Sequence, residues 1–119
     1  MKKNILTYDD DDEILLLCKA ILLKYDYVVE TLSMCQNIIA DIQRFNPGVV
    51  LMDLWIPQIG GEKAIEILKQ HESFQHIPVI IFSANADIKD ICKKVNANGY
   101  IEKPFTVSTF IETIEKHIG

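Results

Sequence analysis

The sequence predicts one α/β domain in which a parallel five-stranded sheet is covered by helices on both faces. Two observations carry this prediction: short strand-like runs alternate with helix-like segments along the whole chain, and three of those runs are almost entirely apolar. Strands that are buried on both faces of a parallel sheet have this continuous apolar pattern. The length of 119 residues suits one such domain, spanning residues 1–119, and is too short for two.

The elements follow one another as five strand–helix units. Strands are expected at residues 4–8, 27–31, 49–52, 79–82 and 100–102. Helices are expected at residues 13–24, 35–45, 61–71, 88–96 and 107–118. The first helix begins among acidic residues, which favour a helix N-terminus, and the last repeats apolar residues at helical spacing. Turn-forming Asn, Pro and Gly separate the units, and no linker or change of composition indicates a second domain.

The composition excludes several classes of protein. With 49% hydrophobic and 24% charged residues, the chain is neither disordered nor of low complexity. Its longest uninterrupted apolar stretch, residues 14–18, is far too short to span a membrane. The three cysteines form an odd, widely spaced set that is typical of reduced thiols. We therefore expect a cytoplasmic protein with no membrane partner.

The negative charge is concentrated in one place. Lys and Arg number 12 and Asp and Glu number 17, which gives a net charge of −5, and the run at residues 9–13 holds five of the acids. The rest of the chain is therefore neutral. With Arg44 as its only arginine, the chain lacks the broad basic surface that nucleic-acid binding needs, so no direct nucleic-acid partner is expected.

Polar side chains follow four of the five strands at the points where the strands end. Asp9 and Asp10 follow the first strand, Asp53 the third, Ser83 the fourth and Lys103 the fifth. The carboxyl ends of parallel strands meet at one edge of a sheet, where ligands bind. The sequence therefore predicts that three carboxylates, a hydroxyl and an amine converge there.

The converging groups favour a divalent cation and phosphoryl chemistry. Two like charges about 4 Å apart repel by roughly 4 kcal/mol at an effective dielectric near 20, so the carboxylates must take up a proton or a cation. Ligands that are all oxygen favour Mg²⁺ or Mn²⁺, and the spacing of the acids does not fit a calcium-binding EF-hand loop. Lys103 and Ser83 would then contact phosphoryl oxygens, leaving Asp53 as the candidate nucleophile.

Four ordered motifs in the chain resemble a known family. They are ILTYDDD at residues 5–11, VLMDLWIP at residues 50–57 leading to Gly61, IIFSA at residues 80–84, and GYIEKPF at residues 99–105. From end to end the chain resembles the CheY-like receiver domain of two-component response regulators. That resemblance implies a flavodoxin-like (βα)5 three-layer sandwich with strand order 2-1-3-4-5, two helices on one face and three on the other.

The resemblance also implies a role for each site residue. Asp53 would be the phosphoacceptor and a metal ligand. Asp10 would bind Mg²⁺ (or Mn²⁺) directly, Asp9 would bind it through water, and the backbone carbonyl of Trp55 would be a further ligand. Because Trp55 is bulky where family members often have Asn or Met, we also expect a long-lived phosphoryl group.

The other implied roles concern switching and partners. Ser83 would move toward the phosphoryl group, Lys103 would pair with that group, and Tyr100 would turn inward as the switch aromatic. The phosphoryl group would come from a histidine kinase or a histidine phosphotransfer protein. A downstream effector would bind the face formed by the fourth helix, fifth strand and fifth helix. The chain would catalyse its own phosphorylation and dephosphorylation and would not be an enzyme acting on an external substrate.

The first helix carries a second apolar stripe. Helical spacing directs Ile14, Leu17, Cys18 and Ile21 toward the core. Leu16, Ala20 and Leu23 then lie on the opposite side, facing solvent. We expect these three side chains to contribute to the surface on which the phosphohistidine donor docks.

Other functions remain open from sequence alone. The main alternative is a receiver domain that is never phosphorylated and acts only as a protein-interaction module. A magnesium-dependent phosphohydrolase would need a second acid two residues after the nucleophile, where Trp55 stands. A flavodoxin-like cofactor-binding module would need Gly, Ser or Thr in the first loop, which is acidic instead.

Overall fold

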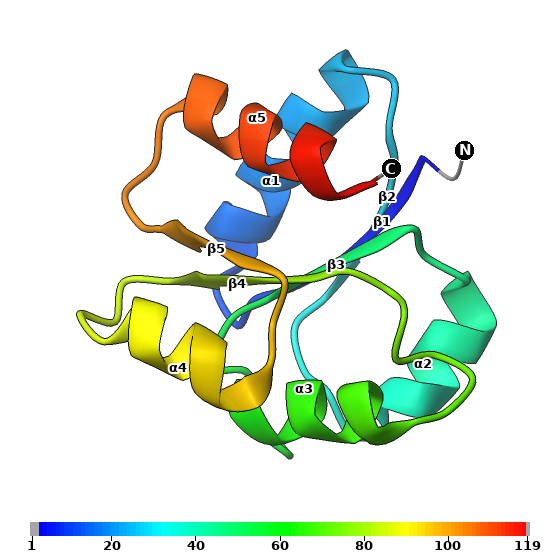
Figure 1. Cartoon of the computed structure of the whole chain (residues 1–119). Helices are drawn as coiled ribbons and strands as arrows, with labels where there is room; N and C mark the ends of the chain where they lie inside the picture. Colours follow the sequence, from blue (N-terminus) through cyan, green and yellow to red (C-terminus); the bar gives the residue numbers. More distant parts are fainter. Residues whose placement is uncertain (1–2, 119) are drawn as a thin grey trace.

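The computed structural model describes residues 3–118 and contains a five-stranded parallel sheet (Figure 1). Its strands are β1 Asn4–Tyr8, β2 Val28–Leu32, β3 Val49–Met52, β4 Val79–Ser83 and β5 Gly99–Glu102. They are arranged in the order β2-β1-β3-β4-β5, and every neighbouring pair is parallel. The predicted strand order is confirmed.

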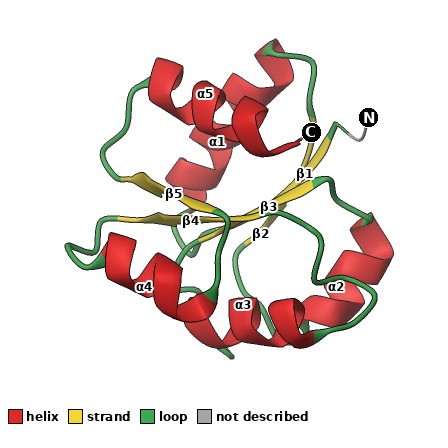
Figure 2. Ribbon diagram, in the orientation of Figure 1, coloured by secondary structure: helices red, strands yellow, loops and turns green. Residues whose placement is uncertain are grey.

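Within the described residues, five helices cover both faces of this sheet. They are α1 Asp12–Lys24, α2 Ile38–Phe45, α3 Gly61–Gln70, α4 Ile88–Val95 and α5 Val107–Ile118. α1 and α5 lie on one face, and α2, α3 and α4 lie on the other (Figures 1 and 2). The result is the three-layer flavodoxin-like sandwich that the sequence predicts. None of the helices in residues 3–118 combines the length and the apolar character needed to cross a bilayer.

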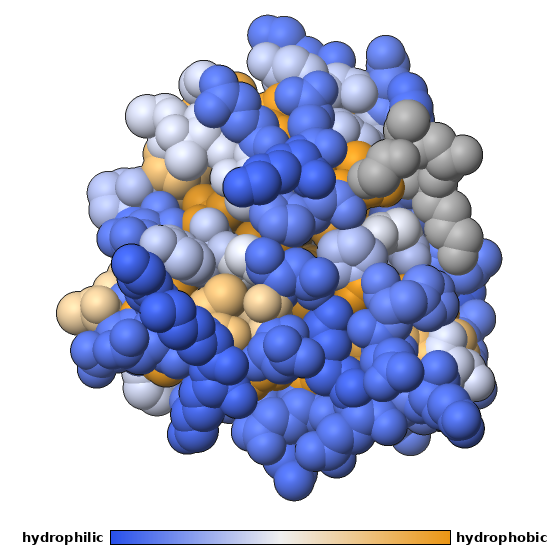
Figure 3. Space-filling model, viewed as in Figure 1, coloured by the Kyte–Doolittle hydropathy of each residue, from blue (hydrophilic) through white to orange (hydrophobic). Residues whose placement is uncertain are grey.

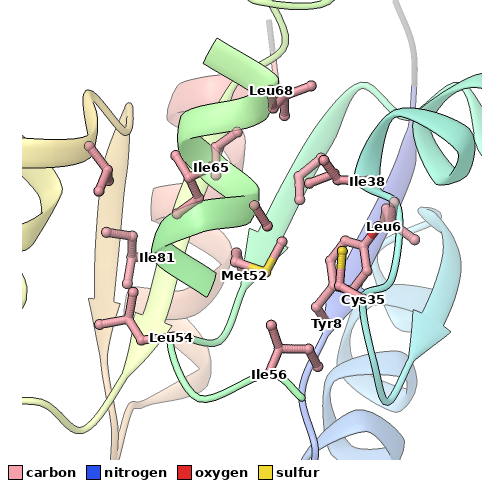
Figure 4. Close-up of a cluster of buried hydrophobic side chains, with 14 of the residues drawn as sticks. Leu6, Tyr8, Cys35, Ile38, Met52, Leu54, Ile56, Ile65, Leu68 and Ile81 are labelled. Atoms are coloured by element: carbon pink, nitrogen blue, oxygen red, sulfur yellow. The ribbon is translucent and has the colours of Figure 1, made fainter. Parts of the chain in front are cut away.

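Successive strand residues point to opposite faces of the sheet and build two separate core layers. Leu6 and Tyr8 of β1 lie in the layer under α2, α3 and α4, whereas Ile5 of the same strand lies in the layer under α1 and α5. Figure 4 shows part of the first layer, where Met52 and Ile65 face one another between the sheet and α3. The central strands are buried on both sides because both layers are filled.

The structure corrects the predicted orientation of α1. Ile14 is partly buried, and Cys18 and Ile21 are buried as expected, but the Leu17 side chain is 47% exposed, so its placement in the core is wrong. Leu15 and Leu22 are buried instead. Leu16, Ala20 and Leu23 do face solvent, as predicted.

The second helix begins three residues later than predicted. Cys35 lies in an isolated β-bridge with Gln58, in which its N–H donates to the Pro57 carbonyl at 3.2 Å. The helix starts after Asn37, whose side-chain oxygen accepts from the N–H of Ala40 at 3.1 Å. A side chain that satisfies a free N–H of the first turn sets the helix start. The bridge also joins the β2–α2 loop to the β3–α3 loop, next to the end of β3.

Candidate functional site

The two buried carboxylates of the site are held in place by the sheet backbone. Asp9 directly follows β1, and its N–H donates to the Leu32 carbonyl of β2 at 3.1 Å. Asp53 directly follows β3, and its N–H donates to the Tyr8 carbonyl of β1 at 3.0 Å. Because the chain leaves adjacent strands at the same edge, both side chains start from neighbouring positions, as the topology predicts.

Three carboxylates meet at this edge. Asp9, Asp10 and Asp53 each offer an oxygen, and the three oxygens lie within 4.8 Å of one another. Asp9 and Asp53 are buried, with 1% and 3% exposure, whereas Asp10 is exposed. Asp9 keeps its orientation because one of its oxygens accepts from the N–H of Asp11 at 3.0 Å. The cluster is therefore open to solvent on the side of Asp10.

Lys103 supplies the positive charge that faces this cluster. Its Nζ lies 2.6 Å from Asp9 Oδ2 and 3.9 Å from Asp53 Oδ1. The same ammonium lies over the ring of Phe82, 4.5 Å from the ring centroid. Its backbone N–H donates to the Ser83 carbonyl at 2.9 Å, and the bond to Pro104 is cis. These contacts hold the ammonium between the two buried carboxylates.

The environment of Asp53 opposes its ionisation. Burial, followed by the negative charge of Asp9, raises the pKa of the Asp53 carboxyl from 3.8 to about 6. The positive charge of Lys103 and the N–H of Trp55, which donates to Asp53 Oδ1 at 3.3 Å, both favour the charged form but are outweighed. One lysine therefore does not neutralise the cluster.

Ser83, the last residue of β4, is buried at 1% exposure. Its hydroxyl oxygen accepts from the N–H of Asn85 at 3.1 Å, and the side-chain oxygen of Asn85 accepts from the N–H of Asp87 at 2.8 Å. Two successive side-chain turns thus connect the end of β4 to the start of α4. Any movement of the Ser83 hydroxyl must break the first of these hydrogen bonds.

The two aromatic candidates occupy different surroundings. The Trp55 side chain is 71% exposed on the loop after β3, although its backbone N–H touches Asp53. Tyr100 is half-buried on β5, paired with Ile81 of β4, and packs against the core layer beneath α4. Tyr100 therefore lies away from the carboxylates and could be coupled to them only through β4 and β5.

The structure explains one residue of the motifs and adds one feature that sequence reasoning missed. At Gly61 a Cβ atom would lie 2.6 Å from the Leu54 Cα and closer still to the Asp53 carbonyl oxygen, so only glycine fits behind Asp53. The missed feature is an apolar groove beside Lys103, lined by Leu17 of α1 and Phe105 of the β5–α5 loop. The groove has no sequence signal, because it depends on the rotation of α1.

The donor set fits a small divalent cation. All three converging groups are carboxylates, whose hard oxygens Mg²⁺ and Mn²⁺ prefer. Burial first, and the charge of Asp9 second, raise the pKa of Asp53, and Lys103 does not offset them. Asp9, Asp10 and Asp53 would hold the ion, and the backbone carbonyl of Trp55 as a fourth ligand stays a prediction.

A family model described as the response regulator receiver domain matches residues 5–115 of this chain. The chain therefore belongs to the receiver domain family of two-component signalling. Among curated relatives, the polar-differentiation response regulator DivK of Brucella ovis is 38% identical over 77 residues, which are 62% of this chain and 62% of DivK. A protein of Thiocystis violacea is 35% identical over 81 residues, 66% of this chain but 12% of that protein. The matched segment is thus less than two thirds of either relative.

Solved structures have the same fold. A CheY-like receiver domain protein from Methanospirillum hungatei is 26% identical, with a TM-score of 0.85 over 99% of this chain and 94% of that one. The receiver domain of sensor histidine kinase PA1611 from Pseudomonas aeruginosa is 23% identical, with a TM-score of 0.88 over 100% and 99%. That structure has a magnesium ion coordinated in its active-site cleft.

Proposed function

We propose that this chain accepts a phosphoryl group on Asp53 from a phosphohistidine donor and thereby changes its affinity for partner proteins. The observation that carries this proposal is the convergence of Asp9, Asp10 and Asp53 with Lys103 at the carboxyl edge of the sheet. Membership of the receiver domain family, over residues 5–115, supports it. We propose Mg²⁺, or Mn²⁺, as the cofactor.

The transfer is a nucleophilic displacement at phosphorus. An oxygen of ionised Asp53 attacks, the new P–O bond forms as the donor's P–N bond breaks, and the electron pair of that bond stays on the imidazole nitrogen. A divalent ion bound by the carboxylates would neutralise charge on the phosphoryl oxygens and on Asp53. Lys103 then exchanges part of its contact with Asp9 for the incoming oxygens.

The side chains around Asp53 convert this transfer into a change of shape. The Ser83 hydroxyl gives up the N–H of Asn85 and donates to a phosphoryl oxygen instead. The β4–α4 connection loses one of its two side-chain turns, and Tyr100, paired to β4 through Ile81, turns inward. The face formed by α4, β5 and α5 changes as a result, and a downstream effector binds there.

The phosphohistidine donor docks over α1. Leu16 and Leu23 are 70% and 53% exposed, and Ala20 lies between them on the same side of the helix. The groove between Leu17 and Phe105 continues this apolar surface toward Lys103. A histidine kinase or histidine phosphotransfer protein that covers this surface would hold its histidine close to Asp53.

In this proposal the chain catalyses its own phosphorylation and does not turn over an external substrate. The donors of such a phosphoryl group act inside the cell, so we propose that the chain works in the cytoplasm. Its three cysteines are free thiols in the structure, which agrees with a reducing compartment.

Intact-mass spectrometry after incubation with acetyl phosphate and Mg²⁺ tests the assignment. The chain should gain the mass of one phosphoryl group, Asp53→Asn should gain none, and Asp12→Asn should behave as the unaltered chain does. Asp12 is a matched control because it belongs to the same acidic run but lies outside the carboxylate cluster. Persistent modification of Asp53→Asn would refute Asp53 as the acceptor.

A further inference from the structure

A half-buried lysine and an Asn-Gly pair meet at the amino end of β5. Gly99 is the first residue of this strand and Asn98 directly precedes it, at the end opposite to Lys103. Lys69, in the last turn of α3, reaches across to Asn98. The connection between α4 and β5 runs across the face of the molecule seen in Figure 1, and Figure 3 shows that the surface of this face is mainly hydrophilic. Asn98 is exposed, so water reaches it.

Lys69 is held by neutral oxygens only. Its Nζ donates to the backbone carbonyls of Ile77 at 2.9 Å and Gln75 at 3.3 Å, and to Asn98 Oδ1 at 2.6 Å. Within residues 3–118, no carboxylate lies within 4.0 Å of this ammonium. Burial lowers the pKa of the Lys69 amine, because no nearby negative charge offsets the lost hydration. The shortest contact of the ammonium is therefore a charge-assisted bond to a neutral amide.

The side-chain carbonyl of Asn98 is polarised from two sides. Its Oδ1 accepts from Lys69 Nζ and also from the backbone N–H of Val79, at 2.9 Å. Two donors on one carbonyl oxygen stabilise the negative charge that develops there when a nucleophile adds to the carbonyl carbon. Among the described residues, the amide nitrogen Nδ2 of Asn98 has no hydrogen-bond partner. The fold thus activates Asn98 Cγ and leaves the potential leaving group unrestrained.

The backbone nitrogen of Gly99 is the neighbouring nucleophile. Covalent bonds hold it close to Asn98 Cγ, and glycine has no side chain that would hinder ring closure. The His117 ring fills the space where a side chain would lie, because a Cβ at Gly99 would be 2.9 Å from the His117 Cε1. The packing of α5 on β5 therefore requires glycine at this position and keeps the Asn-Gly pair in place.

We propose that Asn98 is a self-deamidation site, at which the folded chain converts this asparagine into aspartate. The Gly99 nitrogen gives its proton to water and attacks Asn98 Cγ. The new N–C bond closes a succinimide ring as the Cγ–Nδ2 bond breaks, and Nδ2 takes a proton from water and leaves as ammonia. Water then adds to Cγ, the bond from Cγ to the Gly99 nitrogen breaks, and that nitrogen regains its proton. Lys69 and the Val79 N–H stabilise the charge on Oδ1 in both additions.

The product fits the place of the amide. Both contacts of the Asn98 side chain use Oδ1, so a carboxylate at position 98 can keep its bonds to Lys69 and Val79. It also supplies the negative charge that the Lys69 ammonium lacks, which strengthens the join between α3, β4 and β5. No member of the carboxylate cluster takes part, so the inference does not depend on the proposed function.

Peptide mapping by mass spectrometry tests the reaction in the folded chain, incubated at neutral pH over several weeks. Aspartate should accumulate at position 98. Lys69→Met removes the ammonium and should convert roughly tenfold more slowly, whereas Lys69→Arg keeps a cation and should convert at nearly the original rate. Asn96 is the internal control, because it is exposed in the same turn but is followed by Ala97, and it should keep its amide.

The variant Asn98→Asp measures the effect of the product without the reaction. Its midpoint of urea unfolding should lie above that of the unaltered chain. The increase should disappear when Lys69→Met is present as well, because the two side chains then no longer form an ion pair. A midpoint below that of the unaltered chain would mean that a carboxylate does not fit beside Lys69 and would count against the proposal.

Three results of the mapping experiment would overturn the proposal. The first is an Asn98 amide that stays intact in the folded chain. The second is equal or faster conversion in Lys69→Met, which would mean that the lysine only holds the turn closed. The third is slow conversion in Lys69→Arg as well, which would assign the effect to altered packing and not to the positive charge.

Discussion

The surroundings of Asp53 oppose its ionisation, although the carboxyl is ionised at neutral pH. The free-energy cost of this ionisation is part of how the site can work. The carboxyl is buried beside Asp9, which is why its pKa rises to about 6. A carboxylate that the fold destabilises gains more from a cation than a solvated one would. The same burial that weakens the protein without metal therefore favours cation binding.

Removing this charge should stabilise the protein in the absence of metal. The folded chain binds a proton at Asp53 with a pKa of about 6 and the unfolded chain with one near 3.8, so the free energy of unfolding falls as the pH rises between these values. Asp53→Asn lacks this fall. In urea unfolding, the free energy of unfolding of Asp53→Asn should exceed that of the unaltered chain by on the order of 2 kcal/mol at neutral pH. Below about pH 4 the two free energies should be almost equal.

If Asp53→Asn were less stable than the unaltered chain at neutral pH, this view of the site would be contradicted. It would mean that the contact with Lys103, at 3.9 Å, contributes more than burial costs. Asp12→Asn is the comparison variant, because Asp12 is exposed and lies outside the cluster. Its unfolding free energy should change by less than about 0.5 kcal/mol.

The side chain at position 55 should control the lifetime of the phosphoryl group. The Trp55 indole is bulky and has one N–H donor and no acceptor, whereas a short amide can both donate to and accept from an attacking water molecule. Trp55→Asn should therefore lose inorganic phosphate roughly fivefold faster, measured after removal of the donor. Trp55→Phe, which keeps an apolar ring, should resemble the unaltered chain. Slower or unchanged hydrolysis in Trp55→Asn would exclude this role.

At the scale of elements, the predicted bounds of a helix or strand are confirmed where its apolar residues fit only one periodic pattern. α5 begins and ends at the predicted residues because its apolar side chains repeat on one side only. α1 was the harder case, because residues 14–18 are all apolar and every rotation of the helix buries some of them. The packing of α1 against β2 and β1 determines which ones, and so Leu15 is buried and Leu17 is not.

The carboxylate cluster could be predicted because it depends only on topology. Each of Asp9, Asp53 and Lys103 directly follows a strand, and parallel strands bring their carboxyl ends together whatever the loops do. The loop-dependent details could not be predicted. The bridge between Cys35 and Gln58 and the late start of α2 follow from contacts between segments far apart in the chain.

The exposed side of α1 should matter for a protein donor and not for a small one. Leu16→Glu places a charge in the proposed docking surface, where it would lose its water on binding. Phosphotransfer from a phosphorylated histidine phosphotransfer protein should slow about tenfold or more, while modification by acetyl phosphate stays unchanged. Rapid-quench measurement of both reactions checks this prediction.

Val28→Glu is the matched control for the α1 variant. Val28 is 57% exposed on β2 and lies beside Arg44 and Phe45, away from α1's outer side. It adds the same charge to the same kind of apolar surface, and both reactions should proceed at their original rates. Equal slowing in the two variants, or equal slowing of both reactions in Leu16→Glu, would remove α1 from the docking surface.

At the scale of the whole molecule, charge is divided between two regions joined by the sheet. The acidic run supplies the whole net charge of −5 at the carboxyl edge, while the lysines of α4 and α5 gather around β5. β4 lies between the two regions. Ser83 is its last residue, and its Ile81 pairs with Tyr100 of β5. β4 and β5 are thus the two adjacent strands that connect the site with the face formed by α4, β5 and α5.

Cation binding should stabilise the entire fold, because the three carboxylates come together only when the sheet is formed. At a Mg²⁺ concentration about ten times its dissociation constant, the free energy of unfolding should rise by about 1.4 kcal/mol. Urea unfolding with and without Mg²⁺ measures this gain. Asp12→Asn should keep it, whereas Asp10→Asn, with the same change of net charge, should lose most of it. A full gain in Asp10→Asn would mean that the ion binds elsewhere.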